Sequence, residues 1–96
     1  MHVGALEFDL HLPQCRSLKE KRAVVRPIIQ GARRRYHVAA AEVGRHDQWQ
    51  RAVVGVAAVA GTAGHVVDVL DEVERFVWSF PEVEVVSAER RWLDDA

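Results

Sequence analysis

The chain contains few of the residues that cross-link or interrupt small proteins: it has one cysteine, three prolines, no asparagine and only 7% aromatic residues. Because Cys15 is the only thiol, no disulfide forms within the chain and no thiolate cluster is present to hold zinc. The 96 residues are 49% hydrophobic. This composition suits one domain over residues 1–96, with a continuous core that needs no cross-link.

Long apolar runs are also missing. No charge-free stretch approaches the roughly 20 residues that a membrane-spanning helix needs. Near the N-terminus, Glu7 and Asp9 interrupt what would be the apolar part of a signal peptide. We therefore expect a soluble cytoplasmic protein that does not contact a membrane. The five histidines are scattered and none pairs with Cys15 at a ligand spacing, so we expect neither a metal nor a cofactor.

The charges are unevenly distributed along the chain, although the formal net charge is only −1. Ten of the thirteen lysines and arginines lie in residues 16–51, where they face three acidic residues. This segment carries about +7 and the remainder about −8. Such polarity favours contact with phosphate or with an acidic protein surface.

Two patterns predict the first strand and the first helix. Residues 2–12 alternate apolar and polar side chains, which is typical of a strand with one apolar face. Ser17 followed three residues later by Glu20 resembles a capping box that begins a helix. Apolar residues then recur at helical spacing as far as Tyr36. Pro27 lies inside this helix and predicts a bend.

The second half of the chain predicts a hairpin, a helix and a strand. Two apolar runs at residues 37–43 and 49–60 flank a polar turn. Thr62 is expected to cap a second helix that Pro81 ends, and residues 83–92 form a last strand. Within that strand the alternation slips at residues 85–86, which indicates a bulge.

The resulting order of elements, βαββαβ, is that of the ferredoxin-like split βαβ fold of the α+β class. Right-handed crossovers place both helices on one face of a four-stranded antiparallel sheet. The other sheet face is then open. The third strand has apolar residues on both faces, with Val53 and Val59 on one and Val54 on the other. We therefore expect a homo-oligomer that covers the open face.

Two motifs resemble those of the YlxP-like family of small bacterial proteins of unknown function. They are RSLKEKR at residues 16–22, and AEVG at residues 41–44 followed by DQWQRA at residues 47–52. The likeness extends to about residue 93. It implies a ferredoxin-like fold and, because genes of this family often lie beside translation and ribosome-maturation genes, a link to RNA or the ribosome. Pro27 departs from the pattern, since these sequences usually continue the helix without proline.

The hairpin around residues 42–51 has more polar side chains than a turn requires. In one interpretation it is a contact surface, where Trp49 stacks on a base or enters a protein partner and Arg51 binds a phosphate. In the other it is structural, with Trp49 covering the sheet end and Arg51 paired to Glu42 across the strands. His46 next to Asp47 is a weak candidate for an acid/base pair.

Basic residues of the first helix form a stripe beside its apolar face. The stripe is a candidate for contact with RNA phosphates, although a solvated face that complements the helix dipole explains the same pattern. Glu7 and Asp9 occupy the sheet position where RNA-binding domains of this topology carry aromatics, which moves any RNA contact to the helix and hairpin. The candidate contact residues are Lys19, Arg22, Arg26, Arg33, Arg34, Arg45, His46, Trp49, Gln50 and Arg51.

Enzyme functions have little support in the sequence. Acylphosphatase chemistry on this topology needs an asparagine, which the chain lacks. Cys15 precedes the first helix, where a helix dipole can lower the pKa of a thiol, but we expect a small loop residue and not a reactive thiol. The leading hypothesis is a noncatalytic, homo-oligomeric module associated with RNA or the ribosome. The alternative is a homo-oligomeric module that binds an acidic protein partner without nucleic acid.

Overall fold

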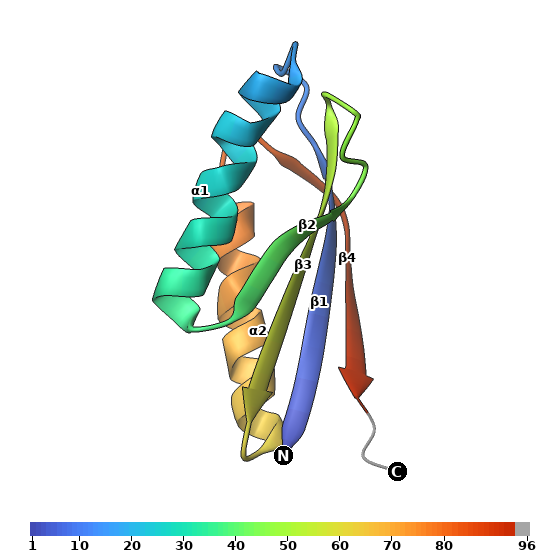
Figure 1. Cartoon of the computed structure of the whole chain (residues 1–96). Coiled ribbons are helices and arrows are strands. Elements are labelled where there is room, and N and C mark those ends of the chain that lie inside the picture. The colour runs from blue at the N-terminus through green and yellow to red at the C-terminus, as the bar shows by residue number, and fades with distance from the viewer. Residues whose placement is uncertain (94–96) are drawn as a thin grey trace.

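The computed structural model describes residues 1–93 and confirms the βαββαβ order of an α+β, ferredoxin-like fold (Figure 1). The elements are β1 (His2–His11), α1 (Leu18–Tyr36), β2 (Ala39–Gly44), β3 (Arg51–Ala60), α2 (Ala63–Trp78) and β4 (Glu84–Leu93). The four strands form one antiparallel sheet in the order β2-β3-β1-β4. Both helices cover the same face, so the molecule has two layers. No helix in the described part of the chain is long and apolar enough to cross a membrane.

The core lies between the sheet and the helices, as the alternation in β1 predicts. Leu6, Phe8 and Leu10 are fully buried on the helical face of β1. Strand β3 contributes alternate residues at 52–58, and each helix contributes a stripe of four buried residues. The side chains between them on β1 and β3 point to the opposite face, which no helix or strand of residues 1–93 covers.

Helix α1 begins and ends as the sequence indicates. The Ser17 hydroxyl accepts a hydrogen bond from the Glu20 N–H at 3.1 Å, and the Glu20 carboxylate accepts one from the Arg16 N–H at 2.7 Å. His37, with a φ of 55°, caps the C-terminus through its N–H to the Arg33 carbonyl. The helix continues through Pro27 without a break. Since Pro27 lies on the exposed side, water can hydrate the carbonyl that loses its partner.

Two irregularities bend the edge strands. In β4, Asp9 and Leu10 pair with Ser87 and Val85, so Val86 is the extra residue of a bulge and that prediction is confirmed. In β2 the register shifts between Glu42 and Gly44, a bulge that the sequence did not predict. The third strand also begins two residues later than expected, at Arg51, which leaves Trp49 in the loop.

A close approach between the helices explains Gly31. A Cβ atom at Gly31 would lie 2.5 Å from Cζ of Phe76. The Phe76 ring cannot easily move away, because it packs edge-on against Tyr36 and Phe80 and lies under the Arg35 guanidinium. The absence of a side chain at residue 31 is therefore a packing requirement of the α1–α2 contact.

We expect Gly31→Ala to lower the free energy of unfolding by about 1–3 kcal/mol, because overpacking outweighs the higher helix propensity of alanine. Gly64→Ala is the matched control, since nothing lies within 4 Å of a Cβ at Gly64 in α2. The control is expected to be neutral or slightly stabilising. Urea unfolding of both variants measures the difference, and equal stabilities would contradict this account.

Candidate anion-binding groove between α1 and β2

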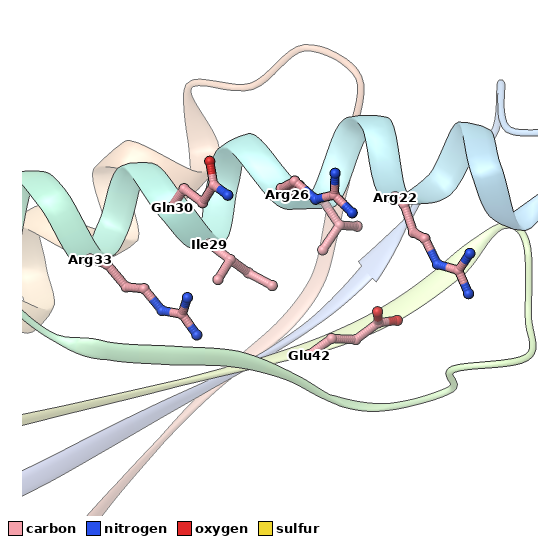
Figure 2. Close-up of a pocket in the computed structure, with 7 residues that line it drawn as sticks. Arg22, Arg26, Ile29, Gln30, Arg33 and Glu42 are labelled. Atoms are coloured by element: carbon pink, nitrogen blue, oxygen red, sulfur yellow. The ribbon is translucent and has the colours of Figure 1, made fainter.

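A groove of about 300 Å³ runs between α1 and the edge strand β2 (Figure 2). Arg22, Arg26 and Arg33 line its helical side, and Glu42 faces them from β2. Arg22 and Arg26 are one helical turn apart, which separates them by about 6 Å along the axis. Ile29 lies between the arginines and adds an apolar surface. The groove is therefore a row of guanidinium groups beside the backbone of an edge strand.

Most of the cations on α1 are available to a ligand. Lys19, Arg22, Arg26 and Arg34 are exposed, and none forms an ion pair with a carboxylate of residues 1–93. Guanidinium groups have five N–H donors in a planar arrangement that matches phosphate and carboxylate oxygens. This side of α1 can therefore bind an anion without first breaking an internal ion pair.

Arg33 differs from the other arginines of the stripe because it is held by the backbone. Its Nε and Nη2 donate to the carbonyl of Ala40 at 3.0 and 2.6 Å. This bond attaches the last turns of α1 to the edge strand. Arg33 is thus partly structural, and its reversal to glutamate would disturb β2, whereas the sequence indicated only a residue of the basic stripe, for RNA contact or for solvent.

The negative charge in the groove is already neutralised by a buried lysine. The Nζ atom of Lys21 lies 2.9 Å from Oε2 of Glu42, and the Lys21 side chain is only 1% exposed. That carboxylate oxygen accepts no hydrogen bond, so the contact is a close ion pair. The ammonium donates instead to the carbonyls of Arg45, His46 and Arg51, at 3.0, 3.1 and 3.4 Å. Glu42 therefore does not cancel the charge of the groove arginines.

Sequence reasoning missed the role of Lys21, although a signal was present. Lys21 lies on the buried stripe of α1, three residues after Leu18 and four before Val25. A lysine on an apolar stripe needs a buried partner. The partner, Glu42, belongs to the second of the two motifs that carry the family resemblance. The structure thus brings the two motifs into contact.

The basic residues of the hairpin are paired within the protein. Nη2 of Arg51 donates to Oδ1 of Asp9 at 2.9 Å, and Nη2 of Arg45 lies 3.6 Å from Oδ2 of the same carboxylate. The pair between Arg51 and Glu42, which the structural interpretation of the hairpin contained, is therefore wrong. Asp9 lies opposite Val53, close to the start of β3, whereas Glu42 lies opposite Val54 on the other edge of that strand.

Two other hairpin side chains bind the backbone. Gln50 donates from Nε2 to the carbonyls of Pro13 and Cys15, at 3.3 and 3.2 Å, which fixes the loop before α1. Nε2 of His46 donates to the carbonyl of Glu42 at 3.2 Å. Trp49 alone among the candidate residues of the hairpin makes no such contact and is 54% exposed. The candidate residues thus form two groups. Most of those on α1 are cations without an ion-pair partner in residues 1–93, whereas most of those in the hairpin already bind other groups of the protein.

Metal and thiol chemistry have no support in the structure. Residues 1–93 contain no group of three histidine, cysteine or carboxylate side chains placed to hold a metal ion. Cys15 is 4% exposed. Burial and the nearby Glu20 carboxylate raise the pKa of its thiol, and the opposing effect of Lys21 is smaller. The buried side chain and the raised pKa agree with a small loop residue and not with a reactive thiol.

Comparison with known proteins gives two matches of nearly full length. Residues 3–90 match the model of a family described as "Protein of unknown function (DUF503)". An uncharacterized protein of Bacillus subtilis (strain 168), YlxP, is 34% identical over 91 residues, which are 95% of this chain and 99% of that relative. Both matches agree with the resemblance noted in the sequence.

We expect Lys21→Met to lower the free energy of unfolding by about 3–5 kcal/mol, because it leaves Glu42 and the carbonyls of the hairpin without their cation. Lys19→Met is the control: Lys19 is exposed on the same turn of α1 and is expected to change stability by less than about 0.5 kcal/mol. Chemical unfolding followed by circular dichroism measures both, and a Lys21→Met variant as stable as the control would refute the structural role.

We expect the Cys15 thiol to react at least about tenfold more slowly with a disulfide reagent in the native protein than in urea, because the side chain is only 4% exposed; its raised pKa acts in the same direction by reducing the thiolate fraction. The same shift makes stability fall as the pH rises through the ordinary thiol pKa of 9.0, since the unfolded chain loses its proton first. Cys15→Ala should remove that part of the alkaline dependence. A fast native reaction would contradict the buried placement.

Proposed function

Because the chain belongs to the DUF503 family of proteins of unknown function, we propose its role from geometry: a noncatalytic module that binds RNA phosphates in the α1–β2 groove. The observation that carries the proposal is the row of arginines on α1. Arg22 and Arg26 face the groove and have no carboxylate partner within residues 1–93. Phosphate contacts of this kind position a nucleic acid without reading its sequence.

The charge balance around the groove favours a polyanion. Lys19 and Arg34 extend the positive surface on the exposed side of α1, and Arg34 lines a second hollow together with Arg22 and Arg26. Glu42, which faces the groove, is paired with Lys21. An approaching phosphate therefore meets several uncompensated cations and no uncompensated carboxylate within the groove.

Exposed Trp49 supports a nucleic acid over a simple inorganic anion. It lies in the hairpin tip, next to the start of α1, because Lys21 binds the carbonyls of Arg45 and His46 in the same tip. An exposed indole ring can stack on a base, and binding sites for single strands combine such rings with a positive groove. Of the hairpin residues, Trp49 is therefore the one that we retain in the proposed contact.

The gene neighbourhood that the family resemblance implies makes RNA the first polyanion to test. The groove itself contains nothing that selects one base over another, so we propose binding without strong sequence preference. Catalysis is not part of the proposal, since the groove holds arginines, an isoleucine, a glutamine and a glutamate already engaged by lysine. An acidic protein partner is the competing outcome, because guanidinium groups also bind carboxylates.

We expect the protein to bind a labelled single-stranded RNA of mixed sequence at low salt, measured by fluorescence anisotropy. Each phosphate contact should contribute a slope of about −0.7 to the plot of log affinity against log salt. The double variant Arg22→Glu and Arg26→Glu should bind at least about tenfold more weakly, with a slope shallower by about 1.4. Arg33 is left unchanged because it holds β2.

Arg75→Glu is the control for this experiment. Arg75 is exposed in the last turn of α2, away from the groove, and its reversal changes the net charge by the same amount as each of the two groove substitutions. It should leave RNA affinity nearly unchanged. Absence of RNA binding at low salt would overturn the proposal, and binding of polyglutamate instead would favour the acidic protein partner. RNA binding that survives the double variant would exclude the groove.

A further inference from the structure

The sheet face opposite the helices, here called the open face, has a floor of very small residues. In the register of the sheet, Ala57 pairs with Ala5 on one side and with Ala39 on the other. Gly55 pairs with Ala41, two residues along and therefore on the same face. The floor is hollowed, with volumes of about 430 and 170 Å³. A partner that packs on this face must therefore supply protruding side chains.

Protruding apolar side chains lie next to this floor on the same face. Val59 and Leu93 share one row with Val3 and are 64% and 65% exposed. Val43, the extra residue of the β2 bulge, lies over Gly55 and is 52% exposed. A two-fold dimer presents the same patch from both protomers, so its interface needs projections and hollows within one patch. The open face has both.

We propose that the open face binds a second copy of this chain, in a two-fold dimer that seats Val59 and Leu93 of each protomer over the alanine and glycine floor of its partner. The molecule measures 43 × 24 × 18 Å. Its sheet face thus offers on the order of 1,000 Å², against the roughly 800 Å² that each partner contributes to a standard interface. The face is large enough for a stable dimer.

The charges on the open face favour this occupant over a nucleic acid. Arg91 lies 3.5 Å from Glu89 and 3.9 Å from Glu7, and Arg51 binds Asp9. Arg45 also lies 3.6 Å from the Asp9 carboxylate, so three arginines balance these three carboxylates and two identical faces meet without net repulsion between them. Among residues 1–93, no aromatic side chain lies on this face for a base to stack on, and its arginines are already paired with carboxylates.

The strand edges favour association through the face and not by strand addition. The carbonyls of Ala40 and Glu42 on the edge strand β2 already accept hydrogen bonds from Arg33 and His46. At the other edge, the bulge at Val86 distorts β4. A side chain that hydrogen-bonds to an edge carbonyl hinders pairing with another strand, and so does a bulge. The open face is then the apolar surface left for a partner.

Light scattering coupled to size exclusion, at micromolar concentrations of the full chain, tests this proposal. The wild-type protein is expected to be a dimer. The single variants Val59→Glu and Ala57→Glu should each raise the dissociation constant of the dimer at least about 100-fold. The two-fold symmetry places the new carboxylate of both protomers in the interface, where burial without a partner is costly. Both positions lie outside the core, so circular dichroism of the monomers should remain that of the wild type.

Trp78→Glu is the matched control, since Trp78 is 60% exposed on α2, in the layer on the opposite side of the sheet. It is expected to leave the dimer intact. A wild-type protein that is monomeric throughout the micromolar range would overturn the proposal. A dimer that survives both open-face variants, or one that only Trp78→Glu dissociates, would overturn it as well.

Discussion

The shape of the hairpin depends on one buried charge, the ammonium of Lys21. It links the first turns of α1 to β2 through Glu42 and to the tip through the carbonyls of Arg45, His46 and Arg51. Removing a charged group from water is costly, and the cost is offset only when every N–H of the ammonium is satisfied. The chain between residues 42 and 51 must therefore turn its carbonyls inward. The bulge after Glu42 and the left-handed Arg45, with a φ of 58°, are consistent with this demand.

This arrangement changes the meaning of the uneven charge distribution. Among the basic residues at 16–51, three form ion pairs with carboxylates of the protein, namely Lys21, Arg45 and Arg51. Arg33 donates hydrogen bonds to a backbone carbonyl. On the acidic side, Arg90 binds Asp71 and lies 3.5 Å from Glu74, which joins β4 to α2. Only the cations without such a partner can attract a ligand. Of these, Arg22 and Arg26 of α1 line the groove, and Lys19 and Arg34 are exposed elsewhere on the helix. Counting charges along the sequence overstates the basic surface, because it cannot distinguish paired side chains from free ones.

The fold could be predicted from the sequence because it depends on periodicity. Alternation in β1, the cap at Ser17 and the slip at Val86 are local signals, and each corresponds to an observed feature. The candidate site could be predicted only in part. Lys21 and Glu42 are 21 residues apart, and their contact depends on how the helix packs on the sheet. Likewise, the sequence shows only that Gly31 weakens the helix; that it makes room for Phe76 depends on how α2 packs against α1.

The two proposed surfaces are compatible because they lie on different sides of the molecule. The groove lies between α1 and β2 on the side of the sheet that the helices cover, whereas the alanine and glycine floor lies on the opposite face. Arg33, beside the edge strand β2, lines hollows on both sides. A dimer formed through the open face would therefore leave a groove exposed on each protomer. Two weak phosphate-binding grooves in one particle increase the effective concentration of the second once the first is occupied. Dimerisation would then strengthen binding to a long polyanion without any new contact, since neither groove needs a residue from the other protomer.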